Sequence, residues 1–211
     1  MSEASFTWPP ALPLVAILRG LSPESAVDVG HTLYAAGFRV MEVPLNRPGA
    51  LDCIAQLVAA MPADTLVGAG TVTETSQVDA VIAAGGRLIV SPHADPAVIA
   101  YARSKGMYVV PGVLTPTEAF AALRAGAHAL KIFPAEALGE MGFKALASVM
   151  PAGTLLWPVG GVTPGNMRAW RQYGASGFGI GGALFQPGMR LDDIADRAAS
   201  MVAAWQSQEP E

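Results

Sequence analysis

Lys131 is the residue whose type and surroundings most directly indicate covalent chemistry. The chain holds three lysines, and only Lys131 lies inside an apolar run, residues 129–133. Burial of an ammonium lowers its pKa from about 10.4 and so raises the fraction of neutral amine at pH 7. A neutral amine attacks a ketone to form a Schiff base. We therefore predict that Lys131 is a nucleophile.

Glu42 is the matching carboxylate, because it also interrupts an apolar run, residues 40–43. Schiff-base carbon–carbon chemistry needs a group that passes protons to water, to the carbinolamine and to the enamine carbon. One carboxylate with a raised pKa can serve all three steps. The plainer alternative is a buried ion pair of Glu42 and Lys131 that contributes only to packing, which we disfavour since buried charges are costly to keep for stability alone.

The elements that must position these side chains alternate along the whole chain. Candidate strands are short apolar runs, at residues 14–18, 40–43, 66–68, 88–90, 107–110, 129–133, 155–159 and 177–180. Candidate helices are amphipathic stretches between them, including residues 22–36, 77–84, 96–105, 116–125 and 164–173. Prolines after capping residues predict helix starts at Ser22, Asp95, Thr115 and Thr163. Glycines predict helix ends at Gly37, Gly85, Gly106, Gly126 and Gly174.

Continuous apolar strands joined by helices favour a parallel sheet covered on both faces, and eight such units fit a (β/α)8 TIM barrel. A doubly wound open sheet is the alternative, because the repeating unit alone does not show closure. We predict one domain over residues 1–211, with residues 1–12 as an N-terminal extension and residues 207–211 as a C-terminal tail.

Composition narrows the class of partner. The chain has 17 acidic and 13 basic residues, and its net charge of −4 argues against a nucleic-acid partner. The net charge does not exclude a small anionic ligand. The sequence has no signal-like start and no apolar run of membrane-spanning length, so we expect a cytoplasmic protein without a membrane partner. His31, His93 and His128 lack metal-ligand spacing, so no metal is expected, and Cys53 is expected to be a buried thiol.

In a parallel barrel the reactive groups lie at the carboxyl ends of the strands. These positions are Arg19, Glu42, Thr71, Ser91, Pro111 with Gly112, Lys131, Gly160 with Gly161, and Gly181 with Gly182. Arg19 is suited to a bidentate grip on a substrate carboxylate, and Thr71 offers a hydroxyl to the same group. Thr71 has the alternative of serving only a neighbouring loop.

Glycine-rich turns follow the last two candidate strands. They hold Gly160, Gly161 and Val162 after one strand and Gly181 and Gly182 after the next. Phosphate sites of barrels are built from these two loops, where glycines let backbone N–H groups approach the anion. A tight turn without a ligand would also use glycine, but two such turns together favour a phosphate site.

These segments, taken in order, resemble a known family. The runs Ile17-Leu18-Arg19-Gly20, Glu42-Val43-Pro44-Leu45-Asn46, Gly68-Ala69-Gly70-Thr71-Val72, Leu130 to Glu136 and Val159-Gly160-Gly161-Val162 are similar to those of the 2-keto-3-deoxy-6-phosphogluconate and -galactonate aldolases. The resemblance extends from about Pro13 to Gln206.

The resemblance implies a homotrimeric barrel that cleaves a phosphorylated keto-deoxy sugar acid to pyruvate and glyceraldehyde 3-phosphate, with no metal or cofactor. It assigns the Schiff base to Lys131 and the acid/base role to Glu42. Arg19 and Thr71 would lie in the pyruvate region, and Phe133 would flank the imine.

Two positions bear on the substrate. The gluconate enzymes tend to read E-V-T-L-R and P-T-G-G-I where this chain has residues 42–46 and 158–162, which look like the galactonate enzymes. Val159 in place of threonine removes a hydroxyl near the epimeric carbon, so we favour 2-dehydro-3-deoxy-6-phosphogalactonate and keep the gluconate epimer as the alternative. The family's last turn ends in a serine where this chain has Gly181-Gly182-Ala183, which would remove one phosphate hydrogen bond, about 1–3 kcal/mol.

Two other functions compete. A metal-dependent sugar-phosphate epimerase would need clustered ligands at strand ends and would leave Lys131 without a role. A non-catalytic sugar-phosphate-binding barrel would keep the glycine turns but would not need Glu42 and Lys131.

Overall fold

Parallel strands and helices alternate in the computed structural model, which describes residues 6–207. The strands are β1 (Leu14–Ile17), β2 (Val40–Pro44), β3 (Leu66–Gly70), β4 (Leu88–Val90), β5 (Tyr108–Val110), β6 (Gly112–Val113), β7 (Leu130–Ile132), β8 (Leu156–Pro158) and β9 (Phe178–Ile180). The helices are α1 (Ala26–Ala35), α2 (Ala50–Ala60), α3 (Thr75–Ala83), α4 (Pro96–Ser104), α5 (Pro116–Arg124), α6 (Ala135–Ala147), α7 (Met167–Gln172) and α8 (Leu191–Gln206).

Every predicted strand is present, and one is interrupted. The fifth continues past Val110 and is divided at Pro111 into β5 and β6. Proline has no backbone N–H, so the ladder of hydrogen bonds breaks at this residue. The candidate helices are also present, but α2, α6 and α8 were not among those predicted by residue range.

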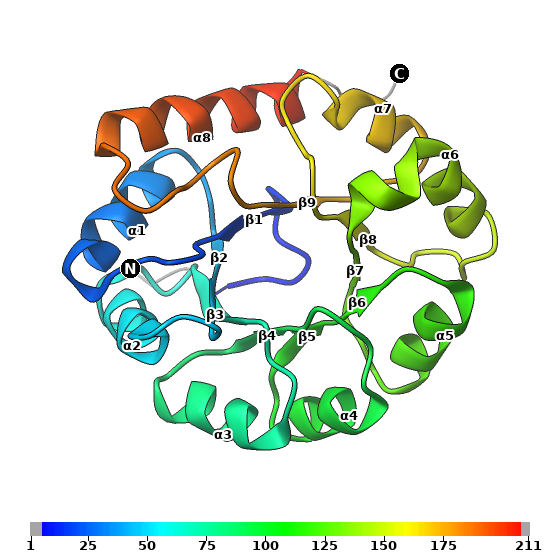
Figure 1. The fold of residues 1–211 in the computed structure, drawn as a ribbon, viewed down its shortest axis with the longest axis horizontal. Helices are drawn as coiled ribbons and strands as arrows, with labels where there is room; N and C mark the ends of the chain where they lie inside the picture. The colour runs from blue at the N-terminus through cyan, green and yellow to red at the C-terminus, as the bar shows by residue number, and fades with distance from the viewer. Residues whose placement is uncertain (1–5, 208–211) are drawn as a thin grey trace.

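The strands form two parallel sheets. Six strands pair in the order β5-β4-β3-β2-β1-β9, and three pair in the order β6-β7-β8. The sheets adjoin at Pro111, and Val159, directly after β8, bridges to Gly179 of β9. The first strand thus pairs with the last, whereas a doubly wound sheet reverses its strand order at a switch point. Helices α1 to α8 surround the strands in chain order, giving a parallel α/β fold (Figure 1).

The apolar side chains of the strands belong to two cores. One core lies between strands and helices, and β2 contributes Met41 and Val43 to it. The other lies inside the curved sheets and consists of Val15, Val40, Leu66, Leu88, Val90, Val110, Ala129 and Trp157. Since successive residues of a strand point to opposite faces, Glu42 points with Val40 toward the inside.

Two of the four predicted helix caps form as expected. Asp95 accepts the backbone N–H of Ala97 at 2.8 Å at the start of α4. Thr115 and Glu118 form a capping box at α5, in which Glu118 accepts the N–H of Thr115 at 2.8 Å. The predicted helix-end glycines all have positive φ, at Gly37, Gly85, Gly106, Gly126 and Gly174.

The start predicted at Thr163 is wrong, and the one predicted at Ser22 is confirmed only in part. A 3-10 helix, Pro23–Ser25, begins directly after Ser22 and leads into α1, but the Ser22 side chain makes no capping bond. After Thr163, helix α7 begins only at Met167, because Asn166 ties the intervening residues into a turn. Oδ1 of Asn166 accepts a hydrogen bond from the N–H of Thr163 at 2.9 Å, and Nδ2 of Asn166 donates to the Gly161 carbonyl at 2.8 Å.

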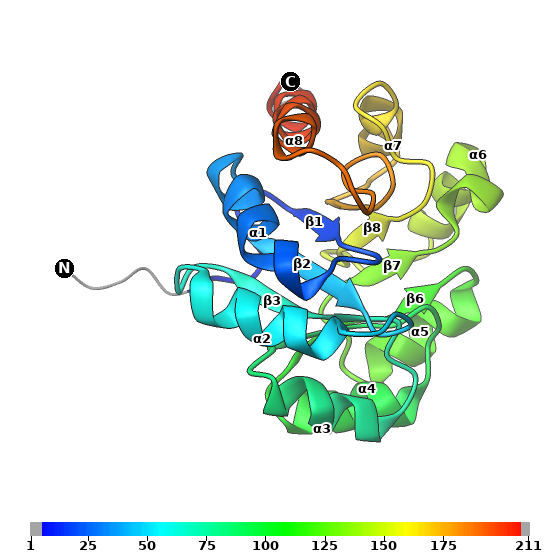
Figure 2. The same cartoon turned by 60° about the vertical axis from the view of Figure 1, so that its left-hand side comes forward.

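An aromatic cluster closes the end of the inner core from which the strands start. The Trp8 ring stacks on Tyr108 with centroids 5.1 Å apart and lies 5.2 Å from Trp157. Figure 2 shows the N-terminal segment entering on the side from which the β1 and β2 arrows begin. The predicted extension therefore packs against the inner core over its described part, while residues 1–5 and 208–211 lie outside the described residues.

Two smaller predictions concern Cys53 and the membrane. Cys53 is buried, as expected, and its Sγ donates to the Leu21 carbonyl at 3.3 Å. Within residues 6–207, no helix combines the length and the apolar character needed to cross a bilayer.

His128 makes the aromatic cluster sensitive to acid. Val109 donates its N–H to Nδ1 of His128 at 3.0 Å, and burial together with the nearby Arg103 lowers the pKa of His128 from 6.5 to about 4. The unfolded chain therefore takes up this proton at a higher pH than the folded chain. The contribution of His128 to stability is full above pH 6.5 and declines as the pH falls toward 4.

We expect His128→Gln, which does not titrate, to weaken the fall of Tm between pH 7 and pH 4.5. The measurement is the difference in Tm between wild type and variant across this pH range. In that difference the contributions of all other titrating groups to Tm cancel. An identical pH dependence for both proteins would contradict the assignment.

Candidate active site

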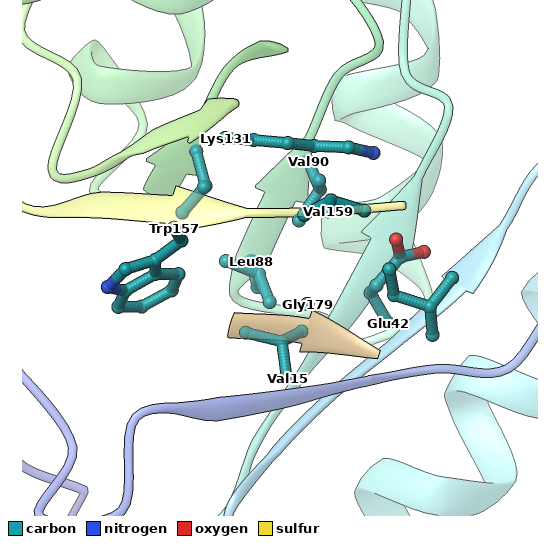
Figure 3. A pocket seen from close by; sticks show the side chains of 10 residues that line it. Val15, Glu42, Leu88, Val90, Lys131, Trp157, Val159 and Gly179 are labelled. Atoms are coloured by element: carbon teal, nitrogen blue, oxygen red, sulfur yellow. The ribbon is translucent and has the colours of Figure 1, made fainter. Parts of the chain in front are cut away.

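Lys131 and Glu42 line one small cavity inside the sheets (Figure 3). Lys131 comes from β7, where it pairs with Gly112 and Trp157, and Glu42 comes from β2, where it pairs with Ile17. In Figure 3 the ammonium and the carboxylate point toward the same end of the cavity, away from Trp157. The rest of the lining carries no charge and consists of Val15, Ile17, Leu88, Val90, Val110, Trp157, Val159 and Gly179.

Glu42 is a buried carboxyl whose pKa is raised. Its side chain is 1% exposed, and its Oε2 atom has no hydrogen-bond partner. Loss of water raises the pKa of Glu42 from 4.5 to about 7, and the charges of Lys131 and Arg19 offset only part of that rise. Near pH 7 this carboxyl therefore exists in both forms and can give or take a proton.

Lys131 shows the complementary shift. Its side chain is 7% exposed, and burial lowers the pKa of its ammonium, an effect that Glu42 opposes and Arg19 reinforces. No N–O contact of 4.0 Å or less joins Lys131 to Glu42, so the ion pair considered as the plainer alternative does not form in this structure. Its Nζ lies 4.8 Å from the centre of the Phe133 ring. The amine is therefore not held as a carboxylate-paired ammonium.

Gly70 makes room for Glu42, and sequence reasoning did not single it out. A Cβ atom on Gly70, the last residue of β3, would overlap the Glu42 carboxylate. Glycine at this place lets the carboxylate lie directly over the neighbouring strand. The register of β3 against β2 was a usable signal. Gly70 lies two residues beyond Gly68, so both glycines face inward on the strand that pairs with β2.

Arg19 and Thr71 follow the carboxyl ends of β1 and β3. Arg19 is exposed and donates from Nη1 to Oδ1 of Asn46 at 3.3 Å, a contact that the sequence did not indicate. Thr71 has φ 58°, and no other non-glycine residue among those described has positive φ. A β-branched residue in this conformation costs about 1–3 kcal/mol, and such strain clusters at functional sites.

The first glycine turn is shaped by its backbone and by Glu136. Gly160 and Gly161 have φ values of 108° and 67°, which favour glycine. A Cβ on Gly160 would also overlap the carboxylate of Glu136, which comes from the first turn of α6. The backbone N–H groups of Gly161 and Val162 have no acceptor among residues 6–207.

The second turn uses glycine for a different reason. Gly181 and Gly182 do not have positive φ, and a Cβ on Gly182 would meet no atom within 4 Å. Neither conformation nor protein packing therefore requires glycine at position 182. The N–H groups of Gly182 and Ala183 also find no acceptor in the described part of the chain. Open space beside unpaired N–H groups is what close approach of an anion requires.

Comparison with known proteins agrees with this arrangement. Residues 10–198 match the family described as "Aldolase: KDPG and KHG aldolase". The chain belongs to the KDPG and KHG aldolase family.

Named relatives in this aldolase family cover nearly the whole chain. A probable 2-dehydro-3-deoxy-6-phosphogalactonate aldolase of Rhizobium meliloti is 47% identical, over 92% of this chain and 91% of the relative. The 2-dehydro-3-deoxy-6-phosphogalactonate aldolase of Escherichia coli is 44% identical, over 94% and 97%. The structure named "Native KDPGal structure" superposes with a TM-score of 0.93 at 43% identity, covering 96% of this chain and 98% of that one.

The aldolase fold therefore brings most of the predicted residues to one end of the strands. Lys131, Glu42 and Phe133 lie in or beside the cavity, and Arg19 acts electrostatically on both charged groups. The described residues contain no cluster of three or more His, Cys, Asp or Glu side chains suited to a metal ion.

Gly70→Ala tests whether the placement of Glu42 matters to the aldolase. The new methyl group would displace the carboxylate, and a shift of about 1 Å in a catalytic group costs roughly 100-fold in rate. We expect kcat to fall by about this factor while the far-UV circular dichroism is unchanged. Gly165→Ala is the matched control, because its Cβ would come no closer than 4.0 Å to the nearest atom, in the Thr163 side chain. Equal kcat values for the two variants would contradict this role of Gly70.

Proposed function

We propose that this protein is a class I aldolase that cleaves 2-dehydro-3-deoxy-6-phosphogalactonate to pyruvate and D-glyceraldehyde 3-phosphate. The observation that carries the proposal is the pairing of a buried lysine and a buried carboxyl in one apolar cavity with no ion pair between them. The names of the relatives at 47% and 44% identity support the galactonate substrate.

Lys131 and Glu42 divide the chemistry. The neutral amine of Lys131 attacks the C2 ketone, and protonated Glu42 gives its proton to the carbinolamine hydroxyl, which leaves as water. The Glu42 carboxylate then removes the proton of the C4 hydroxyl as the C3–C4 bond breaks. The bonding electrons pass to the enamine of pyruvate, and glyceraldehyde 3-phosphate departs. Protonation of the enamine carbon by Glu42 and hydrolysis of the imine release pyruvate and restore Lys131.

Other residues hold the substrate at its two ends. Arg19 and Thr71 bind the carboxylate next to the imine, supported by their position beyond β1 and β3, and Phe133 flanks the imine. The phosphate binds at Gly160, Gly161, Val162, Gly181 and Gly182, supported by the unpaired N–H groups in both turns.

The gluconate epimer is the second candidate substrate, and Val159 bears on the choice. Val159 lines the cavity beside Lys131 and offers no hydrogen bond to a sugar hydroxyl. A non-catalytic sugar-phosphate-binding protein is the candidate from another class, but it would have no use for the Lys131 and Glu42 pair.

We propose further that the two sheets together form one closed (β/α)8 barrel in a single domain, and that the protein is a cytoplasmic homotrimer. The pairing of β1 with β9 and the bridge from Val159 to Gly179 support closure. Exposed apolar side chains, including Met141 at 67% and Val149 at 51%, support a subunit interface.

Borohydride trapping tests the Schiff base. With pyruvate and borohydride, we expect one pyruvate-derived adduct on the peptide that carries Lys131 and none on the peptides of Lys105 or Lys144, which serve as internal controls. Lys131→Ala should remove the adduct. A folded wild-type protein that gains no adduct would rule out the lysine mechanism and favour the binding-protein alternative.

Val159→Thr tests the substrate preference. Threonine keeps the shape of valine, and its hydroxyl offers one hydrogen bond. The ratio of kcat/KM for the gluconate epimer to kcat/KM for the galactonate epimer should therefore rise about tenfold. Exchange of the pyruvate methyl protons, which does not involve the epimeric carbon, should be unaffected. An unchanged ratio would show that Val159 does not determine the substrate preference.

A further inference from the structure

Two side chains donate hydrogen bonds to the carbonyl of Gly182. Arg197, in the second turn of α8, donates from Nη1 to this carbonyl at 3.3 Å. Gln186 donates to it from Nε2 at 3.1 Å. Neither residue was singled out in the sequence, because both lie beyond the glycine turn in an ordinary polar setting.

These two bonds fix the direction of an unpaired N–H. In a trans peptide the C=O and the following N–H point in opposite directions. With the Gly182 carbonyl held toward Gln186 and Arg197, the N–H of Ala183 faces away from them. That N–H and the N–H of Gly182 have no acceptor among the described residues.

Arg197 also brings a charge to a groove beside the second glycine turn. It lines a groove of about 280 Å³ together with Pro164, which follows the first turn, and Ala183, which ends the second. Asp196 lines the same groove, but no ion pair of 4.0 Å or less joins it to Arg197. The contact with Gly182 uses only Nη1, so the other guanidinium donors have no partner within residues 6–207.

Backbone N–H groups alone leave a phosphate dianion without a full counter-charge. Arg197 lies on the carbonyl side of the Gly182–Ala183 peptide, so its charge acts on an anion at the N–H groups through space and not by direct hydrogen bonds. We infer that Arg197 is a positioning residue of the phosphate site, which orients the Gly182–Ala183 peptide and adds positive charge near the 6-phosphate of the substrate. The inference rests on the proposed function, since it names a residue of that same site.

The test compares Arg197→Met with wild type on three reactions. Methionine keeps the apolar stem of the side chain and removes its charge. The reactions are cleavage of the 6-phosphorylated keto-deoxy acid, cleavage of its non-phosphorylated counterpart, and exchange of the pyruvate methyl protons. Arg124→Met is the matched control, because Arg124 is exposed in the last turn of α5 and its loss changes the net charge equally.

We expect Arg197→Met to raise KM for the phosphorylated substrate about tenfold, with kcat and pyruvate exchange nearly unchanged. KM for the non-phosphorylated substrate should stay the same, and Arg197→Lys should recover part of the loss because it restores the charge. Arg124→Met should match wild type in all three reactions.

Two results would overturn the inference. One is an unchanged KM for the phosphorylated substrate in Arg197→Met, and the other is an equal rise for both substrates, which would indicate a structural defect. Failure of the proposed function looks different, because wild type itself would then fail to exchange pyruvate protons or to favour the phosphorylated substrate.

Discussion

The cost of removing one ammonium and one carboxylate from water dominates the electrostatics of the cavity that Lys131 and Glu42 line. Lys131 and Glu42 share an apolar interior, and burial is the largest influence on the pKa of each. It raises the pKa of the acid to about 7 and lowers that of the base, so burial favours the neutral form of each group. A closer ion pair would oppose both shifts, because each charge would stabilise the other. The separation of the two groups therefore matters as much as their burial.

The strands enforce both conditions. Alternation along β2 turns Glu42 inward between Met41 and Val43, which face the helices. Glycine at position 70 gives the carboxylate a place over β3, away from the ammonium on β7. The aromatic cluster around Trp8 and Trp157 fills the opposite end of the interior, where the strands begin. Packing thus sets the electrostatics of the site.

The sequence predicted the strands and the inward-facing charged residues Lys131 and Glu42 because both signals are local. A lysine or glutamate inside an apolar run is informative without knowledge of its neighbours, and strand-end glycines are equally visible. Contacts between distant segments were not visible, including Gly70 under Glu42, Asn46 on Arg19 and Arg197 on Gly182. The helix start predicted at Thr163 was wrong because Asn166 binds the same backbone groups. The residue type at position 163 carries no information about that contact. The pairing of the first strand with the last is likewise a long-range contact, which the repeating pattern does not specify.

Direct titration of the Glu42 carboxyl tests the central claim. Infrared difference spectra of wild type minus Glu42→Gln isolate the carbonyl band of the protonated acid as a function of pH. The account predicts that this band loses half of its intensity near pH 7, where burial places the pKa of Glu42. A midpoint close to the ordinary carboxyl value of 4.5 would show that Glu42 is fully charged at neutral pH and would contradict the account.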